Sequence, residues 1–253
     1  MRAGGNVSEI FVSFQGEGLH AGRRHLFVRL GGCPLRCRYC DTPDSLVPVD
    51  TCHVLSPDGS HRRPNPLSVH DLEAELASIT AVAPPLHALA VTGGEPLMQA
   101  DFVATWLRER SARAAEPLPI MLETAGILPA RLAQVLPWIA IVSLDLKCPS
   151  NTAERPRWDE HEACLAAAVR GGREVYVKMP VDDTTAAEEV EHGAALLARV
   201  APAVPLFLTP LTPPSEKRLT IGAGALDRFH ALASRRHRDV RVLPQIHKAL
   251  GIL

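Results

Sequence analysis

Three cysteines with metal-binding spacing lie in the segment CPLRCRYC, at Cys33, Cys37 and Cys40. Thiolates in such a C-x3-C-x2-C run can curl around one metal centre. Four thiolates would saturate an iron–sulfur cluster or a tetrahedral zinc ion, whereas three leave one position open. Because a catalytic centre needs an open position for an exchangeable ligand, the spacing favours a catalytic cluster.

A structural zinc site is the alternative interpretation of these cysteines. Its fourth ligand would come from a distant residue such as Cys52, His53 or Cys148. Spacing alone does not exclude this site. The remaining cysteines, Cys164 included, are scattered along the chain, and each is expected to be a small buried residue.

A glycine-rich turn, TGGEP at positions 92–96, forms the second chemical signal. It follows the apolar run Leu86–Thr92, which predicts a strand. Glycines let a ligand approach the backbone closely, and barrel enzymes place their sites at the carboxyl ends of the strands. The turn is therefore a candidate ligand contact.

Six apolar runs predict the strands that would position these residues. The runs are continuous rather than alternating, which is typical of strands buried on both faces of a parallel sheet. They are His25–Leu30, Leu86–Thr92, Pro119–Glu123, Ile139–Asp145, Glu174–Met179 and Val204–Thr209.

Helical patterns fall between the predicted strands. Ser68, with Asp71 three residues later, predicts a capped helix start, and Asp101 is a plausible N-cap for the next helix. The other helices are expected near Arg131–Leu136, Glu160–Arg170, Ala186–Val200 and Ala225–Arg235. About six βα units indicate an α/β fold with right-handed crossovers, in an incomplete barrel or an open sheet.

Length and charge limit the remaining possibilities. The chain has 253 residues, which suits a single domain over 1–253, and residues 43–66 are expected to be a solvated surface insertion. With 27 basic and 28 acidic side chains, no global positive field exists to bind nucleic acid. No apolar run approaches the ~20 residues of a membrane span, and residues 1–8 lack an apolar signal segment, so a cytoplasmic location is expected.

The cysteine run resembles the signature of the radical S-adenosylmethionine (SAM) enzymes, whose fold is a full or partial (β/α)6 barrel. The resemblance implies that Cys33, Cys37 and Cys40 hold a [4Fe–4S] cluster and that SAM binds its fourth iron. Further SAM contacts are implied along the chain. They are Tyr39 on adenine, Cys40 and Asp41, Gly94 and Glu95 at the amino group, Asp145 on the ribose, Lys147 on the carboxylate, and Thr209.

Four segments resemble the 7-carboxy-7-deazaguanine synthase family. They are FVSFQGEG at 11–18, FVRL at 27–30, CDT at 40–42 and QIHKALGIL at 245–253. The resemblance implies that a pterin binds Phe14, Gln15, Gly16 and Thr92, that Arg29 holds its carboxylate, and that Thr42 binds Mg²⁺ beside it. Residues 239–253 would close over the site, with Leu253 at the pterin ring and His247 either functional or structural.

This chain departs from the family pattern at two strand ends. The fourth predicted strand ends in Asp145-Leu146-Lys147 where Ser-Pro-Lys is common, and the sixth ends in Thr209-Pro210 where Gln-Pro is common. The SAM contacts on these strands are accordingly the least secure.

The implied reaction converts 6-carboxy-5,6,7,8-tetrahydropterin to 7-carboxy-7-deazaguanine with loss of ammonia, in queuosine and deazapurine synthesis. The implied partners are a flavodoxin- or ferredoxin-like electron donor and a second copy of the chain in a homodimer. Two alternatives remain: a radical SAM activase that makes a glycyl radical on a partner protein, and a non-catalytic iron–sulfur or zinc module.

Overall fold

A ten-stranded sheet runs through the whole structure, a computed structural model that describes residues 4–113, 118–212 and 219–252. The strand order is β10-β9-β8-β7-β6-β5-β2-β1-β3-β4. The strands are β1 (Val7–Phe14), β2 (Arg24–Leu30), β3 (Thr51–Ser56), β4 (Gly59–Pro64), β5 (Ala88–Gly93), β6 (Ile120–Thr124), β7 (Ile141–Asp145), β8 (Glu174–Val181), β9 (Leu206–Pro210) and β10 (Val240–Val242).

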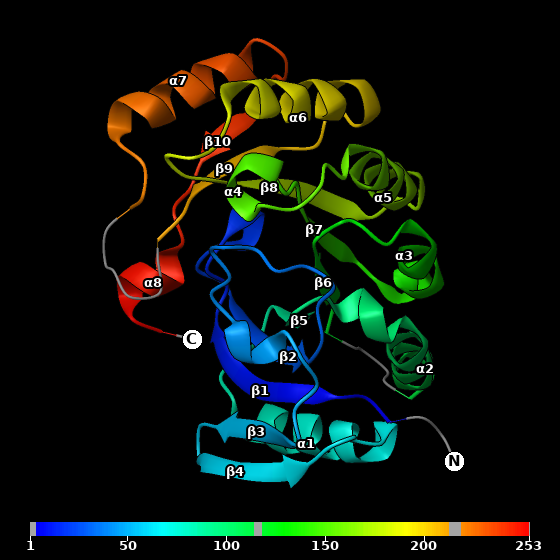
Figure 1. The fold of residues 1–253 in the computed structure, drawn as a ribbon. Coiled ribbons are helices and arrows are strands. Elements are labelled where there is room, and N and C mark those ends of the chain that lie inside the picture. The colour runs from blue at the N-terminus through cyan, green and yellow to red at the C-terminus, as the bar shows by residue number, and fades with distance from the viewer. Residues whose placement is uncertain (1–3, 114–117, 213–218, 253) are drawn as a thin grey trace.

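Helices connect and cover these strands. They are α1 (Val69–Val82), α2 (Ala100–Ser111), α3 (Pro129–Val135), α4 (Pro149–Thr152), α5 (Trp158–Arg170), α6 (Ala187–Val200), α7 (Ala223–Ser234) and α8 (Ile246–Leu250). Four 3-10 turns, η1 (Gly18–His20), η2 (Pro43–Ser45), η3 (Pro96–Gln99) and η4 (Leu136–Trp138), complete the described elements. Figure 1 shows α2, α3 and α5 along one side of the sheet and α8 on the other. Among the described residues, no helix combines the length and apolarity that a membrane crossing requires.

The predicted barrel is confirmed and extended. All six expected strands are present as β2, β5, β6, β7, β8 and β9, each parallel to its neighbour, and β10 adds a seventh. The barrel is incomplete, because β10 lies at one end of the strand order and β4 at the other. The capped start of α1 is also confirmed, since Ser68 accepts a hydrogen bond from the backbone N–H of Asp71. Asp101 is not the N-cap of α2, because the helix begins at Ala100 and its N-cap is Gln99.

The segment 43–66 is not the solvated loop that its composition suggests. After η2 it forms the hairpin of β3 and β4, and β3 pairs in parallel with β1. Cys52 and Val54 on β3 are fully buried, because they face the apolar core. β1 itself, antiparallel to β2, was not expected from the sequence, and it carries the opening segment 11–18 into the sheet.

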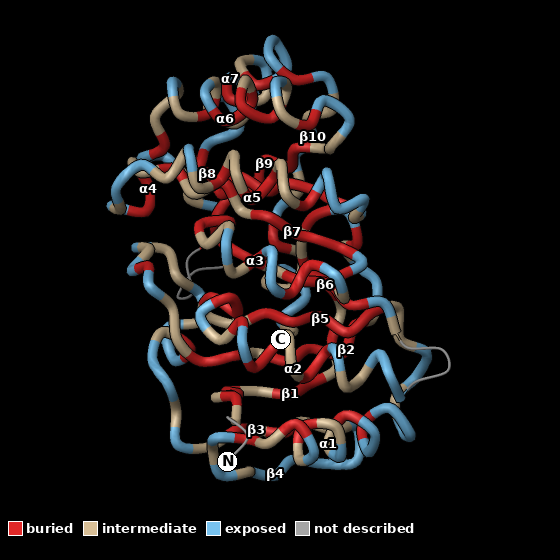
Figure 2. The backbone as a smooth tube through the Cα atoms, turned by 90° about the vertical axis from the view of Figure 1, so that its right-hand side faces the viewer, coloured by how far each residue is buried: buried red, intermediate tan, exposed pale blue. Residues whose placement is uncertain are grey.

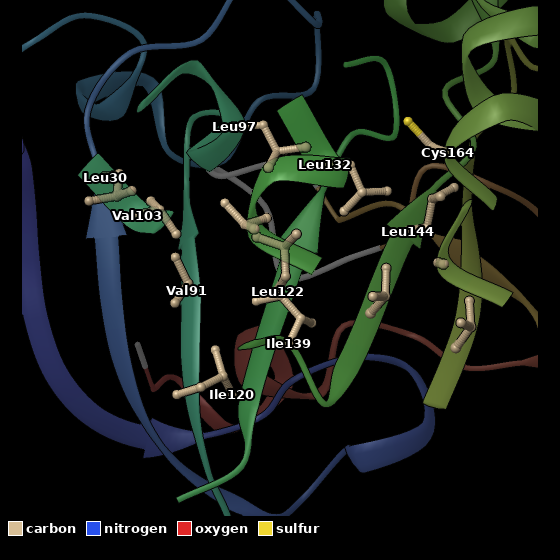
Figure 3. Packing of buried hydrophobic residues seen from close by; sticks show 14 of the residues in the cluster. Leu30, Val91, Leu97, Val103, Ile120, Leu122, Leu132, Ile139, Leu144 and Cys164 are labelled. Atoms are coloured by element: carbon tan, nitrogen blue, oxygen red, sulfur yellow. The ribbon is translucent and has the colours of Figure 1, made fainter. Parts of the chain in front are cut away.

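The strand side chains alternate between two environments. Leu89, Val91, Leu122 and Leu144 belong to the large core between sheet and helices, part of which is shown in Figure 3. Figure 2 shows the central strands β5 to β9 buried along most of their length, whereas β4 at the edge is exposed. The intervening residues face the inside of the barrel and form a second cluster, which includes Phe11, Phe27, Ala90, Met121, Tyr176 and Phe207. The next inward positions along the strands are polar, and they line the cavity described below.

Candidate active site

A cavity of about 1090 Å³ opens where the parallel strands end. It is bounded by the cysteine loop, the end of β1, the strand ends and α8. Nearly all of the residues singled out from the sequence line it: Phe14, Gln15, Gly16, Arg29, Cys33, Cys37, Tyr39, Cys40, Asp41, Thr42, Thr92, Gly94, Asp145, Lys147 and Thr209. Leu253 lies outside the described residues. Glu95 is described, but it does not line the cavity.

The cysteine loop brings three half-buried thiols to one wall of this cavity. Its turn is held by its own backbone, since the N–H of Cys40 donates to the carbonyl of Cys37 at 3.1 Å. Arg36 adds hydrogen bonds of 2.7 Å to the carbonyls of Cys33 and Leu35. Burial raises the pKa of Cys33 to about 11 and also raises that of Cys37, so these thiols are protonated until a metal displaces the protons.

The donor set suits a cluster better than a single ion. Within the described part of the chain, no three His, Cys, Asp or Glu side chains are arranged to hold one metal ion. A cluster is wider than an ion, and each thiolate binds its own iron. Three distant zinc ligands were considered from the sequence. Cys52 and Cys148 are fully buried in the apolar core, whereas His53 lines the cavity.

The glycines of the TGGEP turn fit closely beneath the cysteine loop. A Cβ on Gly94 would lie 2.8 Å from the Cβ of Cys33 and 2.6 Å from two backbone oxygens. Gly93 has a φ of +146° and backs onto Leu30, whose carbonyl oxygen would be 2.1 Å from a Cβ. The two glycines therefore let the loop and the strand end approach as one wall.

Glu95 does not face the cavity as the resemblance implied. Its carboxylate is fully buried and accepts hydrogen bonds from the backbone N–H groups of Leu97 and Ala125 and from the Thr124 hydroxyl. Burial raises the pKa of this carboxyl group. Glu95 therefore ties η3 to the end of β6 and supports the wall from behind.

Two buried hydroxyl groups are available to a ligand. The hydroxyl of Tyr39 and Oγ1 of Thr209 have no hydrogen-bond partner within the described residues, although both residues line the cavity. Such groups cost free energy when they stay unpaired, so a polar ligand that pairs with them gains stability. Thr42 likewise makes no capping hydrogen bond to η2, and its hydroxyl lies 4.0 Å from the sulfur of Cys40.

A buried network of alternating charges crosses the cavity floor. The ammonium of Lys147 lies 2.7 Å from one oxygen of Asp145, and that of Lys178 lies 3.2 Å from the other. Lys178 also contacts Glu17 at 2.5 Å. Burial alone would raise the pKa of Asp145, but the two lysines outweigh it and lower that pKa to about 2. Both lysines stay protonated, because the carboxylates raise their pKa values despite burial.

Glu123, on β6 beside the strand that carries Asp145, organises another part of the cavity, and it was not identified from the sequence. One of its oxygens accepts from Nε2 of Gln15 at 2.8 Å, and the other accepts from the hydroxyl of Thr92 at 2.7 Å. A carboxylate with two further lone pairs in a cavity is suited to N–H donors of a ligand. Arg29, nearby on β2, forms an ion pair of 2.8 Å with Glu9.

The C-terminal segment closes one side of the cavity. The N–H of Ile246 donates to the carbonyl of Gly16 at 3.0 Å, and Lys248 donates to the carbonyl of Thr212 at 2.6 Å. His247 packs against Gly16 so tightly that a Cβ there would lie 1.9 Å from its Nδ1. α8 is therefore a wall of the site, and it depends on a glycine at position 16.

Glu123 and Lys178 have a recognisable signal in the sequence. Glu123 is the lone charge in β6, and Lys178 is the lone charge within β8 after its first residue, Glu174; both positions alternate with core residues. Charged residues are almost never buried unless they are paired, so each indicates an inward-facing partner. Glu17 lies inside the opening segment, but no pattern assigns it a partner on β8.

Comparisons with known proteins agree with this geometry. The profile of the radical SAM superfamily matches residues 27–196. A Geobacter sulfurreducens protein named 7-carboxy-7-deazaguanine synthase is 32% identical over 256 residues, covering 100% of this chain and 99% of the relative. A Methanothermobacter thermautotrophicus protein of the same name is 30% identical over 270 residues, covering 97% of each.

A solved structure shows a similar fold. The crystal structure of QueE from Escherichia coli aligns with a TM-score of 0.54 at 18% identity, covering 96% of this chain and 94% of that chain. The likeness therefore extends over the parallel strands and the additions that flank them.

Proposed function

We propose that this cavity converts 6-carboxy-5,6,7,8-tetrahydropterin to 7-carboxy-7-deazaguanine and ammonia, since the chain belongs to the radical SAM superfamily and, within it, to the 7-carboxy-7-deazaguanine synthase family. The observation that carries the proposal is that the cysteine loop, the polar strand ends and α8 meet in one cavity. The activase and metal-module alternatives are set aside, because relatives matched over their full length carry the synthase name.

Superfamily membership implies a [4Fe–4S] cluster and SAM, and the residues present fit both. The thiols of Cys33, Cys37 and Cys40 would hold the cluster. Tyr39 and Lys147 would face SAM, whose carboxylate suits the ammonium group of Lys147. When bound, the cluster and SAM supply abstraction of a hydrogen atom from the substrate. The protein aims that chemistry and keeps water away from it.

The substrate is proposed to bind at the ends of β1, β5 and β6, beside the lysines. Glu123 and Gln15 present acceptors and donors to the N–H-rich edge of a pterin, and Thr92 fixes the orientation of Glu123. Arg29 is proposed to hold the carboxylate, and in the free protein it pairs with Glu9 instead. A carboxylate ligand would therefore compete with Glu9 for a guanidinium that already faces the cavity.

Mg²⁺ is proposed at Thr42, beside the substrate carboxylate. The hydroxyl of Thr42 lines the cavity without a capping bond. Mg²⁺ keeps several waters and takes few protein ligands, so one hydroxyl and a substrate carboxylate suffice. The metal would neutralise the carboxylate close to the cysteine loop.

The partners are proposed from the same family membership. A flavodoxin- or ferredoxin-like donor would supply the electron, and two copies would form a homodimer. Sedimentation of the purified protein tests the second proposal, and activity with such a carrier in place of a chemical reductant tests the first.

The test of function is an anaerobic incubation of cluster-containing protein with SAM, reductant, Mg²⁺ and 6-carboxytetrahydropterin. We expect 7-carboxy-7-deazaguanine and ammonia to appear in equal amounts. An intact cluster that cleaves SAM without forming this product would refute the substrate assignment and leave the superfamily assignment in place.

A further inference from the structure

Lys178 is a single buried cation shared by two carboxylates of different origin. Its Nζ lies 2.5 Å from Glu17, in the segment after β1, and 3.2 Å from Asp145, at the end of β7. The Lys178 side chain is only 8% exposed. A buried ammonium is stable only when it is paired, so a change in its contact with one carboxylate alters its contact with the other.

The Asp145 side of Lys178 leads to the proposed SAM contacts. Asp145 also binds the ammonium of Lys147 at 2.7 Å. That ammonium lies 5.4 Å from the centre of the Tyr39 ring, in a cation–π arrangement. Two ionic groups, Asp145 and Lys147, therefore join Lys178 to the cavity wall next to the cysteines.

The Glu17 side of Lys178 leads to the proposed pterin contacts. The backbone N–H of Glu17 donates to Oε1 of Gln15 at 3.1 Å, which orients the Gln15 amide. Nε2 of Gln15 then donates to Glu123 at 2.8 Å. The Glu17 side chain itself lines the cavity beside these contacts, so its carboxylate can reach a ligand there when Lys178 releases it.

We propose that Lys178 couples the two ligand subsites, so that SAM and the pterin each tighten the binding of the other. This inference rests on the proposed function of the cavity. A carboxylate that binds Lys147 draws that ammonium away from Asp145. Asp145 then depends on Lys178, which moves toward it and releases an oxygen of Glu17 to the pterin.

The coupling is reciprocal because it is a property of the equilibrium. The factor by which SAM increases the affinity for the pterin must equal the factor by which the pterin increases the affinity for SAM. Couplings through a few buried contacts are commonly 5- to 150-fold, and we expect about 10-fold here.

The experiment measures the dissociation constant of SAM with and without saturating 6-carboxytetrahydropterin. Cluster-containing protein is used anaerobically and without reductant, so that SAM is not cleaved. In the wild type we expect the ratio of the two constants to be about 10. In Lys178→Met we expect a ratio near 1, and Lys178→Arg should restore part of the coupling because the charge is kept.

Two further variants separate coupling from a loss of structure. Glu17→Gln removes the carboxylate that competes with Asp145 for Lys178. SAM alone should therefore bind more tightly than to the wild type, and the ratio should come near 1. This variant provides the test if Lys178→Met fails to fold. Arg110→Met removes another partly buried ion pair, with Glu73 between α1 and α2, and should leave the ratio at its wild-type value.

A merely structural role for Lys178 predicts a different result. Both single-ligand affinities would then weaken in Lys178→Met while the ratio stayed unchanged, and this would overturn the inference. A ratio of 1 in the wild type would overturn it as well. Neither result depends on product formation, so failure of the proposed function is recognised separately in the product assay.

Discussion

Gln245 donates a hydrogen bond of 2.7 Å to Glu17, a residue that lies 228 positions earlier in the chain. The same amide nitrogen lies 3.2 Å from Asp41, directly after the last cysteine of the run. One side chain therefore joins the opening segment, the cysteine loop and α8. The cavity is complete only when all three are in place.

Replacing Cys37 with serine should abolish the iron–sulfur cluster. A serine oxygen is a hard ligand that replaces a thiolate poorly, so we expect iron content to fall by more than half and activity to vanish. Iron analysis and visible absorbance of reconstituted protein provide the measurement. Cys52→Ala is the matched control, because Cys52 is buried on β3 and should not affect iron content. Full iron content in Cys37→Ser would contradict the assignment.

Glu123→Gln should weaken the binding of the pterin and leave the binding of SAM nearly unchanged. The amide keeps the shape and can still accept from Thr92, but it loses the charge that pairs with N–H donors. The loss of one charged hydrogen bond corresponds to about 100-fold in kcat/KM. SAM affinity should stay within about twofold of the wild type. A variant with normal kcat/KM would remove Glu123 from the substrate site.

Gly16→Ala should displace α8 from the cavity. The added Cβ meets the His247 ring and the side chain can only move outward, taking the C-terminal segment with it. We expect at least a 10-fold loss of activity and faster amide exchange in α8, because the Ile246–Gly16 hydrogen bond is broken. Gly224→Ala in α7 has nothing within 4 Å of its Cβ and should leave both quantities unchanged. Equal exchange rates in the two variants would refute this account.

Stability should fall as the pH is lowered from 7 to 5, and His25 should contribute to the fall. Burial, followed by the charges of His87 and His20, lowers the pKa of His25 to about 3. Below pH 6.5, His25 therefore binds a proton in the unfolded chain but stays neutral in the folded chain. Its contribution to stability is present above pH 6.5 and is lost as the pH falls below that value. One such group accounts for about 2 kcal/mol by pH 5.

Denaturant unfolding of His25→Gln at pH 7 and pH 5 measures this contribution. The neutral amide can replace the hydrogen bond to His87 but does not titrate. The difference in unfolding free energy between the two pH values should be smaller than in the wild type by about 2 kcal/mol. An identical difference in both proteins would show that His25 is not the titrating group.

The parallel strands and the cysteine loop were predictable because their signals are local. An apolar run or a thiol spacing of eight residues is read directly from the chain, and β5 and the Cys33–Cys40 loop match those expectations. The hairpin of β3 and β4 was missed because its composition is polar and rich in proline. Its strand character comes from pairing with β1, which is a tertiary contact.

The cavity floor was less predictable for the same physical reason. Lys178 and Glu17 are 161 positions apart, and no local pattern shows that they meet. The direction of the Glu95 side chain was not predictable, because the motif identifies a turn but not where its side chains point. The backbone N–H groups of Leu97 and Ala125 donate hydrogen bonds to that carboxylate, and these contacts are seen only in the folded structure.

The most direct test of the central claim uses 6-carboxytetrahydropterin deuterated at C6, incubated anaerobically with the reduced protein and SAM. The account predicts 7-carboxy-7-deazaguanine as the product and deuterium in the 5′ position of the SAM that is recovered. Product without deuterium transfer, or an absence of product from protein with an intact cluster, would contradict it.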